Sequence, residues 1–177
     1  MSVGEPYGTI PLWCKGGTRL QDNIIVKPSV EKQVDRFLRQ GRVLFFSAPC
    51  GFGKTAVAEA LLSGREVLRL SADSAGFKLP SAETDWQILL LDDLQDMQEE
   101  QDWNALCELI RACPERRFVL LSRGTPPGSL MAFQYTGLMT VLEADDLLFD
   151  ADDVRRLLRL YGVEAADSEI LSLIHIS

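Results

Sequence analysis

The chain of 177 residues is predicted to fold as an α/β protein, a three-layer arrangement in which helices cover both faces of a mainly parallel, five-stranded sheet. Two observations predict this class. Short apolar runs alternate with helical segments along the chain, which is the order that a parallel sheet requires. Two of the runs are apolar throughout, as is typical of strands buried on both faces. With 46% apolar residues, the chain can fill one core and begin a second domain.

The predicted elements follow from periodicity and from the residues that begin or end helices. The first helix begins after Pro28-Ser29, places apolar residues on one face and ends at Gly41. The expected strands are residues 43–47, 67–70, 87–91, 117–122 and 137–142, and the further expected helices are residues 56–62, 102–113 and 151–161. Residues 71–86 contain no convincing amphipathic helix, so the connection between the second and third strands is expected to be abbreviated.

The segment that follows the first strand carries the strongest chemical signal in the sequence. Its residues are Ala48, Pro49, Cys50, Gly51, Phe52, Gly53, Lys54 and Thr55, and all eight are candidates for binding a nucleotide cofactor. In such a phosphate-binding loop, or P-loop, glycines let backbone N–H groups curl around an anion. Lys54 would supply charge for the β- and γ-phosphates, and the Thr55 hydroxyl would ligate Mg²⁺. The predicted fold is therefore that of a P-loop NTPase.

The loop departs from the general pattern G-x-x-x-x-G-K-[ST] at one position. Ala48 stands where the first glycine is expected, whereas Gly53, Lys54 and Thr55 match the pattern. A chance glycine turn between a strand and a helix is the alternative interpretation of these residues. The apolar run before the loop and the helix-forming stretch after it favour the phosphate-binding loop.

Two carboxylates follow the third apolar strand, which resembles a Walker B strand. Residues 88–91 deliver Asp92 and Asp93 to the carboxyl edge of the sheet, where open α/β sheets bind ligands. Asp92 is the candidate Mg²⁺ ligand, and Asp93 is the candidate catalytic group that orients or deprotonates an attacking water. Acidic pairs in this position also occur as plain turn and helix-cap residues.

An arginine follows the fourth apolar strand and is expected at the same edge of the sheet. Arg123 can reach a terminal phosphate with bidentate geometry, and a solvated strand-end arginine is the alternative. Slow hydrolysis would proceed by in-line attack of water, with Lys54 and Mg²⁺ stabilising the developing charge and Asp93 positioning the water. The catalytic candidates are therefore Lys54, Asp93 and Arg123.

Together these motifs resemble the ATPase module of the MalT-like, large ATP-binding LuxR-family transcription regulators, which belong to the STAND class of signal-transduction NTPases. The resemblance rests on Ser47-Ala48-Pro49, the glycine-rich loop, the Leu-Leu-Leu-Asp-Asp strand and Leu-Leu-Ser-Arg, and it spans roughly residues 24–165. Ala48 in the place of the first glycine is usual in that family. The resemblance implies ATP and ADP, with Mg²⁺, as the cofactors.

The resemblance also implies an ATP-dependent switch. ADP would hold a closed monomer, and an inducer with ATP would open the protein for self-association. DNA would be bound only through a C-terminal helix-turn-helix domain that lies beyond this chain. Two alternatives remain open: an AAA-type P-loop ATPase whose purpose is turnover, and an inactive truncated module.

The chain is predicted to divide into four parts. These are an irregular lead-in at residues 1–23, the P-loop nucleotide-binding domain at 24–149, the start of a helical domain at 150–170 and a non-native tail at 171–177. The tail resembles the translation of an adapter end used for sequencing libraries, so its His175 is expected to carry no function.

Charge and cysteine content exclude several classes of function. A net charge of −8 opposes nonspecific contact with nucleic acid or anionic membranes, because such contact needs Lys and Arg to neutralise phosphates. A secretory signal and a membrane-spanning run are both missing from the sequence, which predicts a cytoplasmic protein with no membrane partner. The cysteines form no C-x-x-C pair, so free thiols are expected rather than a zinc site or disulfides; they are Cys14, Cys50, Cys107 and Cys113.

Overall fold

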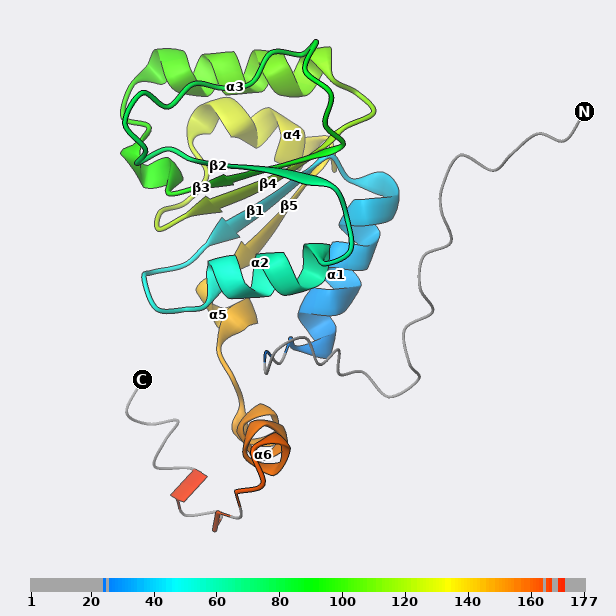
Figure 1. Ribbon diagram of the computed structural model, residues 1–177, viewed down its shortest axis with the longest axis vertical. Coiled ribbons are helices and arrows are strands. Elements are labelled where there is room, and N and C mark those ends of the chain that lie inside the picture. The colour runs from blue at the N-terminus through cyan, green and yellow to red at the C-terminus, as the bar shows by residue number, and fades with distance from the viewer. Residues whose placement is uncertain (1–23, 25, 164, 167–168, 171–177) are drawn as a thin grey trace, which may run out of the picture.

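The computed structural model describes residue 24 and residues 26–163, 165–166 and 169–170 (Figure 1). The predicted lead-in at residues 1–23 and the predicted tail at 171–177, with Cys14 and His175, lie outside the described residues. The proposed boundaries between domains therefore stay predictions.

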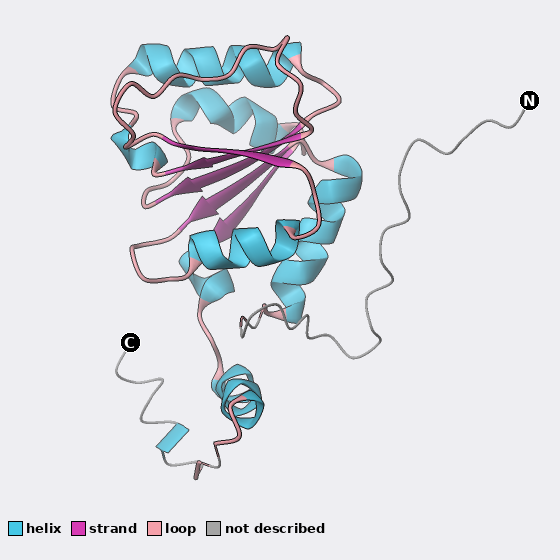
Figure 2. Cartoon of the chain, viewed as in Figure 1, coloured by secondary structure: helices cyan, strands magenta, loops and turns pink. Residues whose placement is uncertain are grey.

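A single sheet of five parallel strands forms the centre of the fold, and it confirms the predicted α/β class (Figure 2). The strands are β1 (Val43–Ser47), β2 (Val67–Ser71), β3 (Ile88–Asp92), β4 (Arg117–Ser122) and β5 (Met139–Glu143), in the spatial order β2-β3-β4-β1-β5. All four neighbouring pairs run parallel. Because the carboxyl ends of parallel strands share one edge, the segments that follow β1, β3 and β4 come together there.

Helices cover both faces of this sheet (Figure 1). The helices are α1 (Pro28–Gln40), α2 (Lys54–Leu62), α3 (Glu100–Ala112), α4 (Met131–Tyr135), α5 (Ala144–Leu147) and α6 (Ala151–Leu160), with the short 3₁₀ helices η1 (Leu94–Asp96) and η2 (Gly128–Leu130). The helices α1 and α2 lie on one face, and α3 and α4 lie on the other. This is the three-layer arrangement that the sequence predicts.

The strand β1 shows how the two cores are divided between the faces. Leu44 and Phe46 belong to the core on the α1 and α2 side, whereas Val43 and Phe45 belong to the core on the α3 side. All four side chains are at most 1% exposed. Burying one such side chain contributes about 1.5–3 kcal/mol. The central strand is therefore fixed from both faces, and the loop that follows it starts from a rigid base.

The connection between β2 and β3 contains no helix in the structure, as the sequence predicts for residues 71–86. Trp86 is 3% exposed, and its ring meets that of Phe118 edge to face with the centroids 5.4 Å apart. Phe77 and Leu79 pack, partly buried, against the core on the α3 side. The connection thus contributes apolar side chains to the sheet cover even though it forms no helix.

Several described elements differ from the prediction or were not predicted. The helix α3 begins at Glu100 rather than at residue 102, and β5 begins at Met139 rather than at residue 137. The short helices η1 and η2 were not predicted. The helix α2 begins at Lys54 rather than at residue 56, so its first turn includes the end of the phosphate-loop motif. The helices α4 and α5 were not predicted, because they have only 5 and 4 residues and such short segments show no helical period.

The helix α6 begins with the N-cap that the sequence predicts. The Asp150 carboxylate accepts a hydrogen bond from the Asp153 backbone N–H at 2.9 Å, and the Asp153 carboxylate accepts one from the Asp150 N–H at 3.2 Å. The hydrogen bond from the Asp153 N–H lowers the pKa of Asp150 below its ordinary value. This reciprocal pair of bonds defines where the helix starts.

The cysteines within the described residues are free thiols. Cys50 is exposed in the loop after β1, whereas Cys107 and Cys113 are buried on the α3 side. Burial raises the pKa of the Cys107 thiol. The prediction of free thiols is therefore confirmed for these three.

Candidate functional site

The candidate site residues gather at the carboxyl edge of the sheet. Residues 48–53 leave β1 and lead into α2, Asp93 follows β3, and Arg123 follows β4. Ser47 at the end of β1 is in register with Ser122 at the end of β4, so these two segments start level with each other. The topology thus brings together groups from three separate parts of the chain.

The backbone of the phosphate loop explains both its glycines and its alanine. Gly51 and Gly53 have φ angles of 89° and 73°, in the left-handed region that favours glycine. Ala48 is not among the described residues with positive φ, its side chain is 1% exposed in the core, and its N–H donates to the Ser122 carbonyl at 3.3 Å. An L-residue with a small side chain therefore fits at position 48.

The N-terminus of α2 faces this loop and offers backbone donors to an anion. Gly53 is the N-cap, and no side chain among the described residues caps it. The first turn of α2 contains no acidic residue, in contrast to the first turns of α1, α3 and α6. The N–H groups of a first helical turn have no partner within the helix, and the helix dipole makes that end positive. Such an end favours phosphate.

Lys54 lies folded against the loop. Its Nζ donates to the carbonyl oxygens of Ala48 and Pro49 at 2.7 and 3.0 Å. These bonds hold the ammonium group over the curve of the loop, next to the N-terminus of α2. Phosphate oxygens are stronger acceptors for an ammonium group than carbonyl oxygens, because they carry charge.

Thr55 and Asp92 form a pair that fits a magnesium ion. The Thr55 Oγ1 donates to the Asp92 Oδ2, and the two oxygens are 2.8 Å apart. Mg²⁺ takes oxygen ligands at 2.0–2.1 Å in octahedral geometry, so neighbouring ligand oxygens are about 2.9 Å apart. Within the described ranges, no group of three or more His, Cys, Asp and Glu side chains could hold a metal ion. A magnesium ion at this pair would need further oxygens from phosphate or water.

Asp93 has an unusual backbone and several polar contacts. Its φ and ψ are 55° and 36°, which makes it the one residue other than glycine with positive φ in the described part of the chain. Its carboxylate accepts from Gln95 Nε2 at 3.0 Å and lies 3.1 Å from Ser71 Oγ. The Ser71 hydroxyl also lies 2.6 Å from the Asp73 carboxylate, and one proton can serve only one of these acceptors at a time.

Arg123 forms a loose ion pair with Asp93. The distance from its Nη2 to the Asp93 Oδ1 is 3.8 Å, and the two side chains are 56% and 32% exposed. Exposed pairs of this kind contribute about 0–1 kcal/mol. The guanidinium group therefore loses little if it turns toward another anion.

Gln95 was missed by the sequence interpretation. It joins the two candidate groups that follow β3 and β4, because its amide bonds to the Asp93 carboxylate and to the backbone N–H of Arg123. The motifs recognised in the sequence, which are residues 48–55, the Asp92-Asp93 pair and the strand before Arg123, do not include this position. The available signal was its place two residues after the carboxylate pair.

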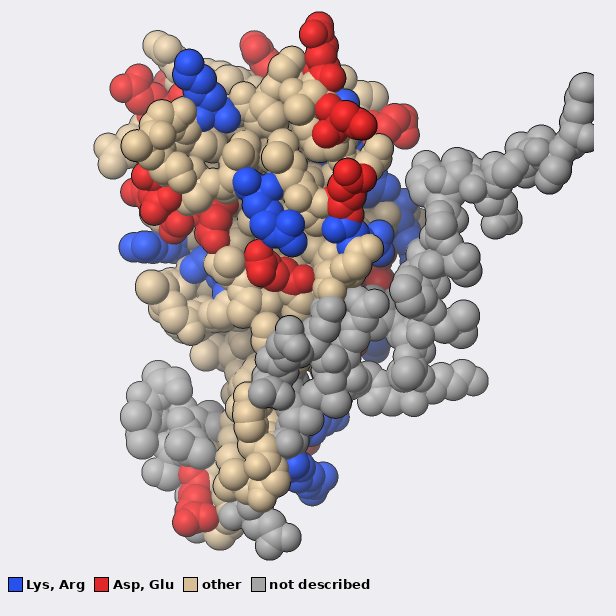
Figure 3. Space-filling model, in the orientation of Figure 1, with Lys and Arg blue, Asp and Glu red and all other residues tan. Residues whose placement is uncertain are grey.

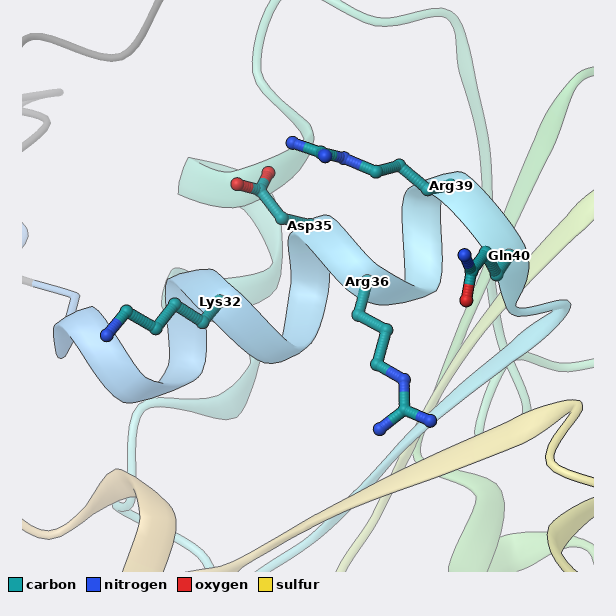
Figure 4. Close-up of a pocket in the computed structure, with 5 residues that line it drawn as sticks. All are labelled: Lys32, Asp35, Arg36, Arg39 and Gln40. Carbon is teal, nitrogen blue, oxygen red and sulfur yellow. The ribbon is translucent and has the colours of Figure 1, made fainter.

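A separate hollow of about 380 Å³ lies on α1 and contains none of the candidate residues (Figure 4). Its described lining residues are Lys32, Asp35, Arg36, Arg39 and Gln40. The helix α1 leads into the amino end of β1, whereas the phosphate loop follows the carboxyl end of that strand. The hollow is thus distinct from the candidate site.

Comparison with known proteins identifies the fold. No protein-family model matches the sequence, and no curated protein matches it either. Among solved structures, the Walker-type ATPase PABY2304 of Pyrococcus abyssi is similar over 90% of this chain and 65% of its own, with a TM-score of 0.58 and 12% identity. The Drosophila ORC bound to DNA is similar over 100% of this chain and 60% of its own, with a TM-score of 0.54 and 11% identity.

These similarities define the chain as a protein with the fold of P-loop ATPases. The chain spans less than two thirds of the length of either structure. At this level of identity the likeness concerns the fold, so the chemistry has to be argued from the chain's own residues.

The charge of the surface and the length of the helices, within the described residues, are relevant to the predicted partners. Figure 3 shows acidic side chains interspersed with basic ones on the face in view. None of the helices in the described ranges has the length and apolar character needed to span a membrane.

Proposed function

We propose that this chain is a nucleotide-binding switch module that holds ATP or ADP with Mg²⁺ at the carboxyl edge of its sheet. The observation that carries the proposal is the pair formed by Thr55 and Asp92, 2.8 Å apart, directly beside Lys54 and the uncapped N-terminus of α2. A cation site next to an anion site is the arrangement that a magnesium nucleotide requires.

In this proposal each candidate residue has a separate task. The backbone of residues 48–53 and the first turn of α2 bind the phosphates, and Lys54 exchanges its bonds to the loop carbonyls for bonds to phosphate oxygens. Thr55 and Asp92 would hold the metal ion. When bound, Mg²⁺ would neutralise charge on the phosphate oxygens.

Hydrolysis, in this proposal, is slow. Asp93 would orient the attacking water, while Lys54 and Arg123 would stabilise charge on the terminal phosphate. The Asp93 carboxylate already accepts a hydrogen bond from Gln95 and lies near Arg123, so part of its capacity is used by the protein. A switch needs only slow turnover.

The family resemblance supports a finer proposal, that of the ATPase module of a MalT-like, LuxR-family regulator. Supporting features are Ala48 in the phosphate loop, the Asp92-Asp93 pair and Arg123 after β4. Self-association with ATP and an inducer, and DNA binding through a separate C-terminal domain, belong to this proposal. The second candidate is an AAA-type ATPase with turnover as its purpose, and the fold similarity to a Walker-type ATPase is compatible with both candidates.

The test is binding of a fluorescent ATP analogue to the full chain with Mg²⁺. Lys54→Ala should weaken binding about tenfold or more, because a hydrogen bond to a charged group contributes about 1.5–3 kcal/mol. Lys78→Ala is the matched control, since Lys78 is exposed in the connection after β2. Equal binding by Lys54→Ala and the wild type would contradict the proposal. Rapid steady-state hydrolysis would favour the AAA-type alternative.

A further inference from the structure

The amide of Gln95 links the ends of two neighbouring strands. Its Nε2 donates to the Asp93 Oδ1 at 3.0 Å, and its Oε1 accepts from the backbone N–H of Arg123 at 3.2 Å. The Nε2 also donates to the Asp96 Oδ2 at 3.2 Å. Both halves of the amide are therefore in use, one toward the end of β3 and the other toward the end of β4.

The partners of Gln95 determine which way its amide points. If the amide were reversed, its oxygen would face the Asp93 carboxylate and its NH₂ group would face the Arg123 N–H. The first contact would set two acceptors against each other, and the second would set two donors against each other. A side chain with one donor end and one acceptor end is thus required at this position.

The backbone that carries Gln95 is firmly anchored. Gln95 lies on η1 between Leu94, which is fully buried, and Met97, which is 4% exposed. The Asp96 N–H donates to the Asp93 carbonyl at 2.9 Å, and the Trp103 Nε1 donates to the Met97 carbonyl at 2.8 Å. Because its base is fixed, the Gln95 side chain can fix the position of its partners.

Gln95 bonds to the backbone of Arg123 and not to its guanidinium group. The hydrogen bond goes to the Arg123 main-chain N–H, while the side chain is 56% exposed and only loosely paired with Asp93. The Arg123 side chain can therefore turn toward a ligand while its main chain stays at a set distance from Asp93. This combination of a bonded main chain and an exposed, loosely paired guanidinium group suits a group that detects a phosphate.

We propose that Gln95 is a positioning residue that makes Asp93 and Arg123 meet the terminal phosphate of a bound nucleotide as one unit. The inference rests on the proposed nucleotide-binding function. Its consequence is specific: Gln95 contributes to the discrimination between ATP and ADP and not to the binding of the phosphates that both share. The shared phosphates would be bound by the loop and the first turn of α2, whereas the hydrogen bonds of Gln95 go to Asp93, Asp96 and Arg123.

The first experiment measures the dissociation constants of ADP and of a non-hydrolysable ATP analogue for the full chain with Mg²⁺. In Gln95→Leu, which has neither donor nor acceptor, the constant for the ATP analogue should rise about tenfold while that for ADP stays unchanged. Gln98→Leu is the matched control, because Gln98 is an exposed glutamine three positions further on. It should leave both constants unchanged. Thermal unfolding of each variant shows whether the fold is intact.

A second variant separates positioning from a merely structural role. Gln95→Glu keeps an acceptor for the Arg123 N–H but sets a carboxylate against Asp93 and Asp96. The other charged groups around Asp93 are Arg123, which pairs with it, Asp92, which accepts from its backbone N–H, and Asp73, which shares the Ser71 hydroxyl with it. Protonation of the new carboxyl restores a donor toward Asp93. Relative to the wild type at the same pH, Gln95→Glu should therefore recover ATP discrimination as the pH falls, and Gln95→Leu should not.

The outcomes are distinguishable. Loss of discrimination in Gln95→Leu together with recovery at low pH in Gln95→Glu supports the inference. Suppose that the wild type binds both nucleotides, and that Gln95→Leu either discriminates between them equally well or loses affinity for both. That result overturns the inference and leaves the proposed function standing. A wild type that binds neither nucleotide overturns the proposed function, and the inference with it.

Discussion

Replacing Ala48 by glycine would restore the general phosphate-loop pattern, yet we expect the change to destabilise the protein. The Ala48 side chain is 1% exposed within the core on the α1 and α2 side. Its backbone is outside the left-handed region, so a glycine gains no freedom that the native conformation uses. The Ala48 N–H already bonds to the Ser122 carbonyl, which holds the start of the loop in place.

The magnitude follows from two losses. A buried methyl group contributes about 0.8 kcal/mol, and the greater flexibility of glycine in the unfolded chain costs about 0.4–1 kcal/mol. We therefore expect Ala48→Gly to lower the free energy of unfolding by about 1–2 kcal/mol. For a urea dependence of about 2 kcal/mol/M, the midpoint of unfolding falls by about 0.5–1 M.

The assay is urea unfolding followed by tryptophan fluorescence, to which the buried Trp86 contributes. Ala82→Gly is the control, because Ala82 is exposed and its replacement changes only the backbone term. The affinity for an ATP analogue is measured in parallel and should not increase. An Ala48→Gly variant as stable as the wild type, or one that binds nucleotide several-fold more tightly, would refute this reasoning.

Three further predictions concern the loop and α6. Gly53→Ala should lower the free energy of unfolding by about 1–2 kcal/mol, because the φ of Gly53 is 73° and lies in the left-handed region. The control Gly128→Ala changes a glycine without positive φ and should be neutral or slightly stabilising. Equal effects of the two variants in urea unfolding would contradict the role of backbone strain. In a Cys14→Ser background, a thiol reagent should modify the exposed Cys50 first, and saturating ATP with Mg²⁺ should protect Cys50 from the reagent. The same labelling rate with and without ATP would argue against nucleotide binding at this loop. Because the native pKa of Asp150 is lowered, its cap stabilises α6 above the ordinary pKa of 3.8, and this stabilisation is lost as the pH falls through the lower native value. The stability difference from Asp150→Asn, which caps without titrating, should change as the pH falls from about 5 to below 3.8, and a constant difference would sink the prediction.

Much of the fold could be predicted because its strands correspond to short runs of apolar residues in the sequence. The runs that contain Phe45 and Leu120 are buried on both faces, so their composition alone marks them as central strands. The order of the strands could not be predicted, since nothing in the local sequence states that β4 lies between β1 and β3. The short helices α4 and α5 escaped for a different reason, because a segment of one turn has no period to detect.

The candidate site residues that could be predicted from the sequence are those that belong to recognised motifs. The structure places Lys54, Thr55 and Asp92 close together, as the motif spacing suggested. Gln95 escaped because its importance comes from contacts across two strands and not from a residue pattern. The left-handed backbone of Asp93 was equally invisible, because aspartate adopts that conformation only in particular turns.

The strand order also determines when the phosphate loop can form as the protein folds. Both neighbours of β1 come from much later in the chain, since Val43 pairs with Phe118 on one side and with Met139 on the other. Contacts between distant residues form slowly, because the intervening chain must first be closed into a loop. The strand that carries the loop therefore gains its partners only after most of the domain has been synthesised. Nucleotide binding would then report that β1, β3 and β4 have assembled.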